Sequence, residues 1–124
     1  MTEIRNYKDL RVWKAAMDLV VEVYDLTKTL PGDERYGLTS QIQRAVVSVP
    51  ANIAEGHSLA TPKLFLKHLR IASGSLAEVE TQIVLASRLD YLTTSQTQPI
   101  LNQITDIQKM LFGLTKAIKA KVLK

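Results

Sequence analysis

The sequence predicts an all-α protein, an up-down-up-down antiparallel four-helix bundle formed by residues 1–124 as a single domain. Three observations lead to this class. Apolar residues recur at spacings of three and four along four successive segments, which is the period of a helix with one buried face. Short breaks separate these segments. No segment alternates apolar and polar residues as a half-buried strand does, and without cysteine no disulfide framework is expected.

The first helix is expected from about Lys8 to Thr29, and it carries two apolar stripes instead of one. One stripe is Leu10, Trp13, Met17, Val20 and Tyr24; the other is Val12, Ala16, Leu19, Val23, Leu26 and Leu30. At about 100° per residue, the two stripes lie roughly 110° apart. One seam of a bundle needs only the narrower stripe. The wider arc predicts a second cover, provided by two neighbouring helices or by another copy of the chain.

The second helix is expected to begin at Gly37 or Thr39 and to end at Glu55 or Gly56. Its apolar positions are Leu38, Ile42, Ala45, Val46, Val49 and Ile53. Pro50 lies inside this segment, where it removes a backbone donor and crowds the preceding turn at a cost of about 3 kcal/mol. The sequence therefore predicts a helix kinked at Pro50, or two shorter helices.

The third helix is expected to open with Thr61 as N-cap and Pro62 in the first turn, and to end near Leu89 or Asp90. Its stripe is Phe65, Leu69, Ala72, Leu76, Val79, Ile83 and Ala86. This is the most regular stripe of the four, and it is typical of a bundle helix.

The fourth helix is expected to be capped by Thr94 or Ser95, with Pro99 tolerated only within its first turn. Its stripe is Ile100, Ile104, Ile107, Leu111, Leu114, Ile118 and Val122. With it the sequence provides the four amphipathic helices of the bundle.

The overall composition is that of a soluble globular protein, with 46% apolar and 23% charged residues. The charged N-terminal residues lack the apolar core of a signal peptide. The longest weakly polar run, residues 45–54, is much shorter than the roughly 20 residues that a membrane span needs. We therefore expect a cytoplasmic protein without a membrane partner.

The positive net charge of +4 is concentrated near the C-terminus. The chain up to Gln98 is balanced, and the lysines that follow are Lys109, Lys116, Lys119, Lys121 and Lys124, against the single acidic residue Asp106. Two interpretations remain open: a solvated helix face, or a patch that binds the phosphates of RNA or DNA. Phe112 is the one aromatic residue among these lysines, so we expect no base-stacking platform and only sequence-tolerant, salt-dependent binding.

A polar seam is expected between the second and third helices. Its residues are Gln41, Arg44, Ser48, Asn52 and Glu55 on the second helix and Arg70, Ser75 and Glu78 on the third. In an antiparallel hairpin that turns near Ala60, Asn52 and Glu55 should approach Arg70. Arg44 should approach Glu78.

Two interpretations of this seam compete. It is a structural network that fixes the pairing of the two helices, or it is a polar pocket for a small ligand. Gly74 fits the network, because a missing side chain lets two helices approach closely.

No catalytic residue, metal site or cofactor is expected. A dimetal bundle needs Glu-x-x-His pairs, and neither His57 nor His68 follows a glutamate by three positions. The five glycines are scattered, so they form no phosphate-binding loop, and no Gly-x-Ser-x-Gly elbow occurs. We interpret the two histidines as surface or helix-end residues and the protein as not an enzyme.

Three strings resemble, in the same order, the bacterial four-helix bundle proteins encoded in 23S ribosomal RNA intervening sequences. They are YKDLRVWKAAMDL at 7–19, YGLTSQIQRAVVSVPANIAEG at 36–56, and FL with LRIASGSLAE within 65–78. The resemblance implies a four-helix bundle, a ring-shaped homopentamer and no catalytic activity. This family is also distantly similar to the accessory proteins of diversity-generating retroelements, which are basic pentamers that bind a reverse transcriptase and nucleic acid.

Together these features predict a non-enzymatic, homo-oligomeric scaffold that binds a partner, with RNA or DNA as the first candidate. The alternative is a small-ligand or protein-binding adaptor that uses the polar seam.

Overall fold

The computed structural model describes residues 6–59 and 61–122. It contains the α-helices α1 (Arg11–Thr27), α2 (Leu38–Ser58), α3 (Pro62–Arg88) and α4 (Thr94–Val122). The short 3-10 helices η1 (Tyr7–Asp9) and η2 (Gly32–Glu34) lie before and after α1, and no strand occurs among the described residues. The all-helical class predicted from the sequence is confirmed.

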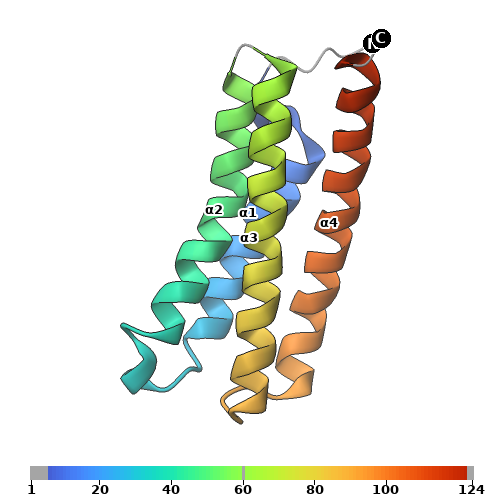
Figure 1. Cartoon of the computed structure of the whole chain (residues 1–124). Helices are drawn as coiled ribbons and strands as arrows, with labels where there is room; N and C mark the ends of the chain where they lie inside the picture. Colours follow the sequence, from blue (N-terminus) through green and yellow to red (C-terminus); the bar gives the residue numbers. More distant parts are fainter. Residues whose placement is uncertain (1–5, 60, 123–124) are drawn as a thin grey trace.

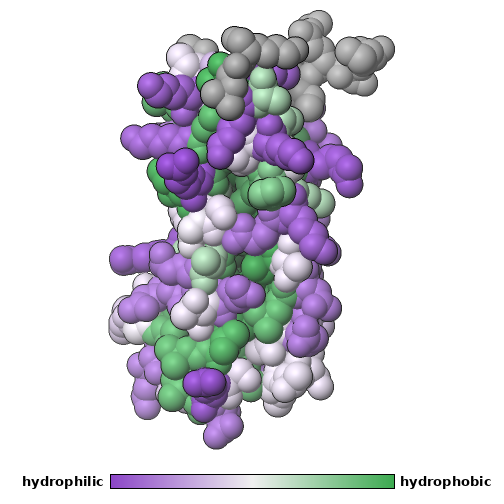
Figure 2. Space-filling view, turned by 45° about the vertical axis from the view of Figure 1, so that its right-hand side comes forward, coloured by the Kyte–Doolittle hydropathy of each residue, from purple (hydrophilic) through white to green (hydrophobic). Residues whose placement is uncertain are grey.

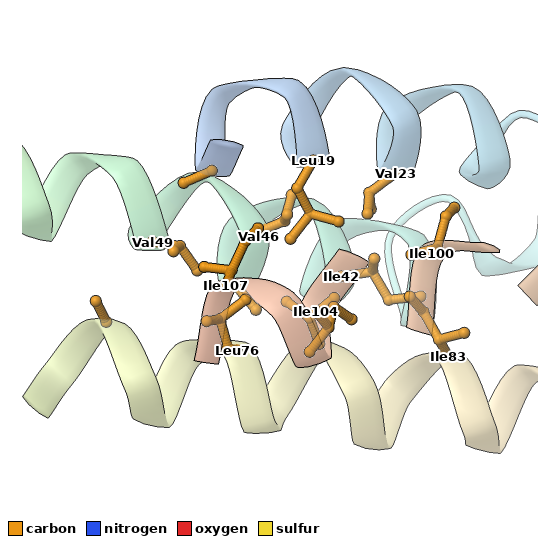
Figure 3. Close-up of a cluster of buried hydrophobic side chains, with 14 of the residues drawn as sticks. Leu19, Val23, Ile42, Val46, Val49, Leu76, Ile83, Ile100, Ile104 and Ile107 are labelled. Carbon is orange, nitrogen blue, oxygen red and sulfur yellow. The ribbon is translucent and has the colours of Figure 1, made fainter. Parts of the chain in front are cut away.

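The helices lie side by side, and each packs on the next one in the chain (Figure 1). In this view the chain runs down α1, up α2, down α3 and up α4. Helix α4 also packs on α1, which closes the bundle. The core lies between them, where Leu19, Val46, Leu76 and Ile104 come together from the four helices (Figure 3).

Helix α1 begins later than expected, because the chain first forms η1. The Asn6 side chain caps η1 by accepting a 2.9 Å hydrogen bond from the backbone of Lys8. Within α1 the second stripe, from Val12 to Leu26, is buried. The first stripe is only partly covered, as described below.

Helix α2 continues through Pro50 to Ser58, so the expectation of two shorter helices is wrong. The kink at Pro50 stays a prediction. Gly56 does not end the helix. A Cβ at this position would lie 2.6 Å from the Cβ of His68 and 3.1 Å from Cδ1 of Phe65. Gly56 is therefore a glycine at which α2 and α3 approach closely, whereas Gly74, predicted for that role, has no atom within 4 Å of a Cβ position.

Capping explains where the last two helices begin. Thr61 accepts a 3.2 Å hydrogen bond from the Leu64 backbone, so this predicted N-cap is confirmed. For α4 the cap is Thr93 and not Thr94 or Ser95. Its hydroxyl accepts from the Gln96 backbone, while the Gln96 side chain accepts at 2.8 Å from the Thr93 backbone. This reciprocal pair is a capping box.

Pro99 lies beyond the first turn of α4, on the exposed side of the helix. The expectation that Pro99 is tolerated only within the first turn is therefore wrong. The apolar stripe of α4 is buried from Ile100 to Leu111. Beyond that point Leu114 and Ile118 are half-buried and Val122 is exposed. The C-terminal third of α4 is thus less deeply packed than its sequence predicts, and three surface hollows lie along it.

Candidate functional site

A groove with a volume of about 570 Å³ lies between α3 and α4. It is lined by Leu66, Arg70, Ser73, Thr105, Gln108, Lys109, Leu111, Phe112, Thr115 and Lys119. We call this the α3–α4 groove. Its volume lies in the range of small-molecule sites, about 300–1,000 Å³.

Two hydrogen bonds fix the floor of the groove. Ser73 Oγ donates to Gln108 Oε1 at 2.8 Å, and Gln108 Nε2 donates to the Ser73 carbonyl at 3.0 Å. Gln108 thereby uses both ends of its amide on one residue of the facing helix. This pairing holds the two walls of the groove at a fixed separation.

The charge of the groove has one sign. Arg70 reaches it from α3, and Lys109 and Lys119 reach it from α4. No carboxylate occurs among the described residues that line it. Figure 2, in which the right-hand side of Figure 1 is turned forward, shows hydrophilic side chains with apolar surface between them.

The other predicted lysines are spread more widely. Lys116 is exposed on α4, one turn after Phe112. Lys121 lines a separate hollow at the end of the bundle, beside Leu10 and Ile118. Lys124 lies outside the described residues. The structure therefore brings together Lys109 and Lys119, and it adds Arg70, which the sequence analysis had placed in the polar seam.

The polar seam between α2 and α3 is a short chain of hydrogen bonds. Ser48 Oγ and Ser75 Oγ lie 2.9 Å apart. Asn52 Nδ2 donates to both the carbonyl and the hydroxyl of Ser48, each at 2.9 Å. His68 Nδ1 lies 3.0 Å from Asn52 Oδ1 and 3.8 Å from a carboxylate oxygen of Glu55. These polar atoms bind one another, which favours the structural interpretation of the seam over a ligand pocket.

The expected charge pairs of the seam are not formed. Arg70 lies on the other flank of α3, and His68 takes the place beside Asn52 and Glu55 that Arg70 was expected to take. No ion pair joins Arg44 to Glu78 within residues 6–59 and 61–122. Gln41, Arg44, Glu55 and Glu78 are exposed, and Ser75 is buried.

His68 is the seam residue that the sequence analysis missed. A signal for it existed, since His68 and Ser75 are seven residues apart and therefore share one face of a helix. The Glu-x-x-His pattern relates residues of one helix only, so it gives no sign that His68 contacts Asn52 and Glu55 of α2.

A family model described as the 23S rRNA-intervening sequence protein matches residues 8–113. The chain belongs to this family. The match includes all of α1, α2 and α3, and α4 as far as Gly113. It thus contains the resemblance noted in the sequence from position 8 onward.

A crystal structure gives the same fold for another chain. It is a protein of unknown function of the S23 ribosomal protein family from Bacteroides thetaiotaomicron, 29% identical in sequence, with a TM-score of 0.79. The similarity covers 85% of this chain and 98% of that one. No curated protein matches the chain.

In this intervening-sequence family member, the first apolar stripe of α1 is only partly covered by the other helices. Leu10 is buried, and Trp13 and Val20 are half-buried. Met17 and Tyr24 remain 42% and 40% exposed. Tyr24 of α1 shares a hollow with Val47 of α2, which is also exposed.

The remaining chemical groups point to no second site. No group of three or more potential metal ligands occurs among the described residues. None of the helices in the described part of the chain is long and apolar enough to cross a membrane. Within the described ranges, the hydrogen bond to Glu34 raises the pKa of Tyr91, with smaller contributions from desolvation and from the charges of Glu34 and Asp33.

Proposed function

We propose that this 23S rRNA-intervening sequence protein is a non-enzymatic, homo-oligomeric bundle of the cytoplasm that binds the phosphates of RNA or DNA in its α3–α4 groove. One observation carries the proposal. Arg70, Lys109 and Lys119 converge from two helices on one groove whose described lining contains no carboxylate. Such a groove attracts a polyanion, and cations that replace its counterions give sequence-tolerant affinity.

The rigid floor adds to this argument. A site on two helices that are held together by Ser73 and Gln108 presents its cations at a fixed spacing. Arg70 can bind a phosphate with two parallel hydrogen bonds, whereas the two lysines act as point charges.

The oligomeric part of the proposal is supported by the open stripe on α1. Met17, Tyr24 and Val47 are exposed apolar side chains on neighbouring helices, and a second copy would bury them. The family resemblance implies a homopentamer, and we propose that number for this chain.

The test combines a mass measurement with a binding measurement. Light scattering coupled to size exclusion gives the mass with and without a short RNA. Fluorescence anisotropy of labelled RNA and DNA, repeated over a salt series, gives the affinity and its salt slope. We expect a pentamer that binds both polymers at low salt and loses affinity as salt rises, because each neutralised phosphate contributes about −0.9 to the slope on duplex DNA and about −0.7 on a single strand.

Matched variants locate the site. Arg70→Gln should weaken binding. It should also reduce the slope of log affinity against log salt by about the contribution of one phosphate contact. Arg88→Gln is the control, because Arg88 is also exposed on α3 but lies about 27 Å away along the helix at 1.5 Å per residue. Lys109→Gln and Lys119→Gln should act like Arg70→Gln. Absence of binding at low salt, or equal losses for Arg70→Gln and Arg88→Gln, contradicts the proposal.

A further inference from the structure

Phe112 is the most unusual side chain of the α3–α4 groove. It lies on α4 and is 72% exposed, so the bundle core does not explain its presence. A phenylalanine buries about 150–250 Å² when it packs in a core or an interface. Here its ring instead lies in the wall of a cationic groove, with Lys109 one turn before it and Lys116 one turn after it.

The sequence alone predicts no base-stacking platform here, but the exposure of Phe112 in a groove that also holds Arg70 reverses that expectation. We propose that the groove takes single-stranded nucleic acid, with an unpaired base stacked on the ring of Phe112. This inference rests on the proposed function, and it names the class of polymer that the same site selects. Arg70, Lys109 and Lys119 then contact the phosphates on either side of the stacked base.

The choice of a single strand follows from the chemistry of the ring. In a duplex the faces of the bases are covered by their neighbours, so an exposed phenyl ring has no partner there. In a single strand the bases separate, and stacking on an aromatic side chain is favourable for every base because each has a π-face. An exposed aromatic residue between cations is the combination that single-strand binding proteins use.

The geometry of the groove supports this arrangement. Residues three or four apart on a helix are neighbours on its surface, so Lys109 and Lys116 flank the ring along α4. Arg70 approaches the same space from α3. The groove of about 570 Å³ is large enough for a base and its sugar, and the pairing of Ser73 with Gln108 beneath it keeps the platform rigid.

The experiment compares two labelled RNAs of about equal phosphate number, a 24-nucleotide single strand and a blunt duplex of two 12-nucleotide strands without a loop, by fluorescence anisotropy at one low salt concentration. Phe112→Leu keeps an apolar side chain of similar size but removes the π-face. Phe112→Tyr keeps the π-face and serves as the conservative control. We expect Phe112→Leu to lose tenfold or more in affinity for the single strand, to stay within twofold for the duplex, and Phe112→Tyr to retain both affinities.

The other outcomes separate this inference from the proposed function. If Phe112→Leu binds the single strand as well as the original protein does, or loses equally on both RNAs, base stacking is overturned while phosphate binding stands. If the assembly changes mass when Phe112 is replaced, the ring is a contact between copies and the inference is overturned. If the original protein binds neither RNA, the proposed function itself fails.

Discussion

Tyr91 Oη donates a 3.1 Å hydrogen bond to Glu34 Oε2, across a sequence separation of 57 residues. The other oxygen of the same carboxylate, Oε1, accepts from the backbone of Leu38 at 3.2 Å, in the first turn of α2. Glu34 thus joins the connection between α1 and α2 to the connection between α3 and α4. Both connections lie at the lower end of the bundle in Figure 1.

The Tyr91–Glu34 bond predicts a loss of stability at high pH. The hydrogen bond needs the phenol proton, and the neighbouring carboxylate disfavours a phenolate, so the pKa of Tyr91 is raised in the folded state. A raised pKa means that the stabilisation is complete below about pH 10, the unfolded value, and disappears as pH rises through the folded value. Tyr91→Phe should unfold at lower urea than the original protein at pH 8, and this difference should shrink towards pH 11.

The control for this prediction is Tyr36→Phe, because Tyr36 is almost fully exposed. Its removal should leave the pH dependence of unfolding unchanged. Urea titrations between pH 8 and pH 11 measure all three proteins. A constant difference between the original protein and Tyr91→Phe across this range contradicts the proposed role of the phenol proton.

Gly56 and Gly74 should respond in opposite directions to alanine. At Gly56 a new Cβ would meet the Cβ of His68, which is the rigid stem of that side chain. Overpacking of this kind costs about 1–3 kcal/mol, more than the gain of about 1 kcal/mol in helix propensity. At Gly74 a Cβ meets no atom within 4 Å, so only the propensity gain of about 0.5–1 kcal/mol remains.

Thermal unfolding of the two variants tests this contrast. Gly56→Ala should lower the midpoint and Gly74→Ala should raise it. A rise for both would show that α2 and α3 separate at Gly56 without cost.

The apolar stripes were enough to predict the helices, because burial of one side of each helix against its two neighbours in the bundle imposes a spacing of three and four. On α3 every stripe residue from Leu69 to Ala86 is buried, and only Phe65 at its start is half-buried. The polar side chains were harder to place. Arg70, Gly74 and Glu78 follow at steps of four, and each step of four turns about 40° past a full helical turn. Over two such steps the side-chain position therefore rotates around α3, from the α4 flank, where Arg70 lies, towards the α2 flank.

The groove itself could not be predicted from the sequence, for a related reason. Periodicity gives the buried side of each helix but not which helix stands beside which flank. Only the packed bundle shows that Arg70 of α3 faces Lys109 and Lys119 of α4. The same holds for Gly56, whose lack of a side chain matters only because His68 packs against it.

Asp90 offers a site for stabilisation. It follows α3 and has a φ of 63°, in the left-handed region where the backbone of residues other than glycine is strained. The backbone N–H of the next residue, Tyr91, donates a 3.0 Å hydrogen bond to the carbonyl of Ala86. Asp90 therefore terminates α3 in the manner of a Schellman motif. Asp90→Gly should raise the free energy of unfolding by about 0.5–1 kcal/mol, since the strain of about 1–2 kcal/mol exceeds the entropy that glycine adds to the unfolded chain. Asp90→Ala keeps a Cβ and should show no gain, and urea unfolding measures both.

The seam between α2 and α3 yields a prediction about coupling. Ser48 and Ser75 bond each other at 2.9 Å, and Ser75 is buried. Removing either hydroxyl leaves its partner short of one hydrogen bond, so Ser48→Ala and Ser75→Ala should each cost about 1 kcal/mol. Removing both should cost less than the sum, with a coupling energy of about 0.5–1 kcal/mol in a double-mutant cycle.

Ser73→Ala is the matched control on the same helix, since Ser73 bonds Gln108 instead. Its cost should add to that of Ser48→Ala within about 0.5 kcal/mol. Equal additivity in both cycles would show that the seam contributes no pairwise energy and that the apolar stripes alone fix how α2 and α3 pair.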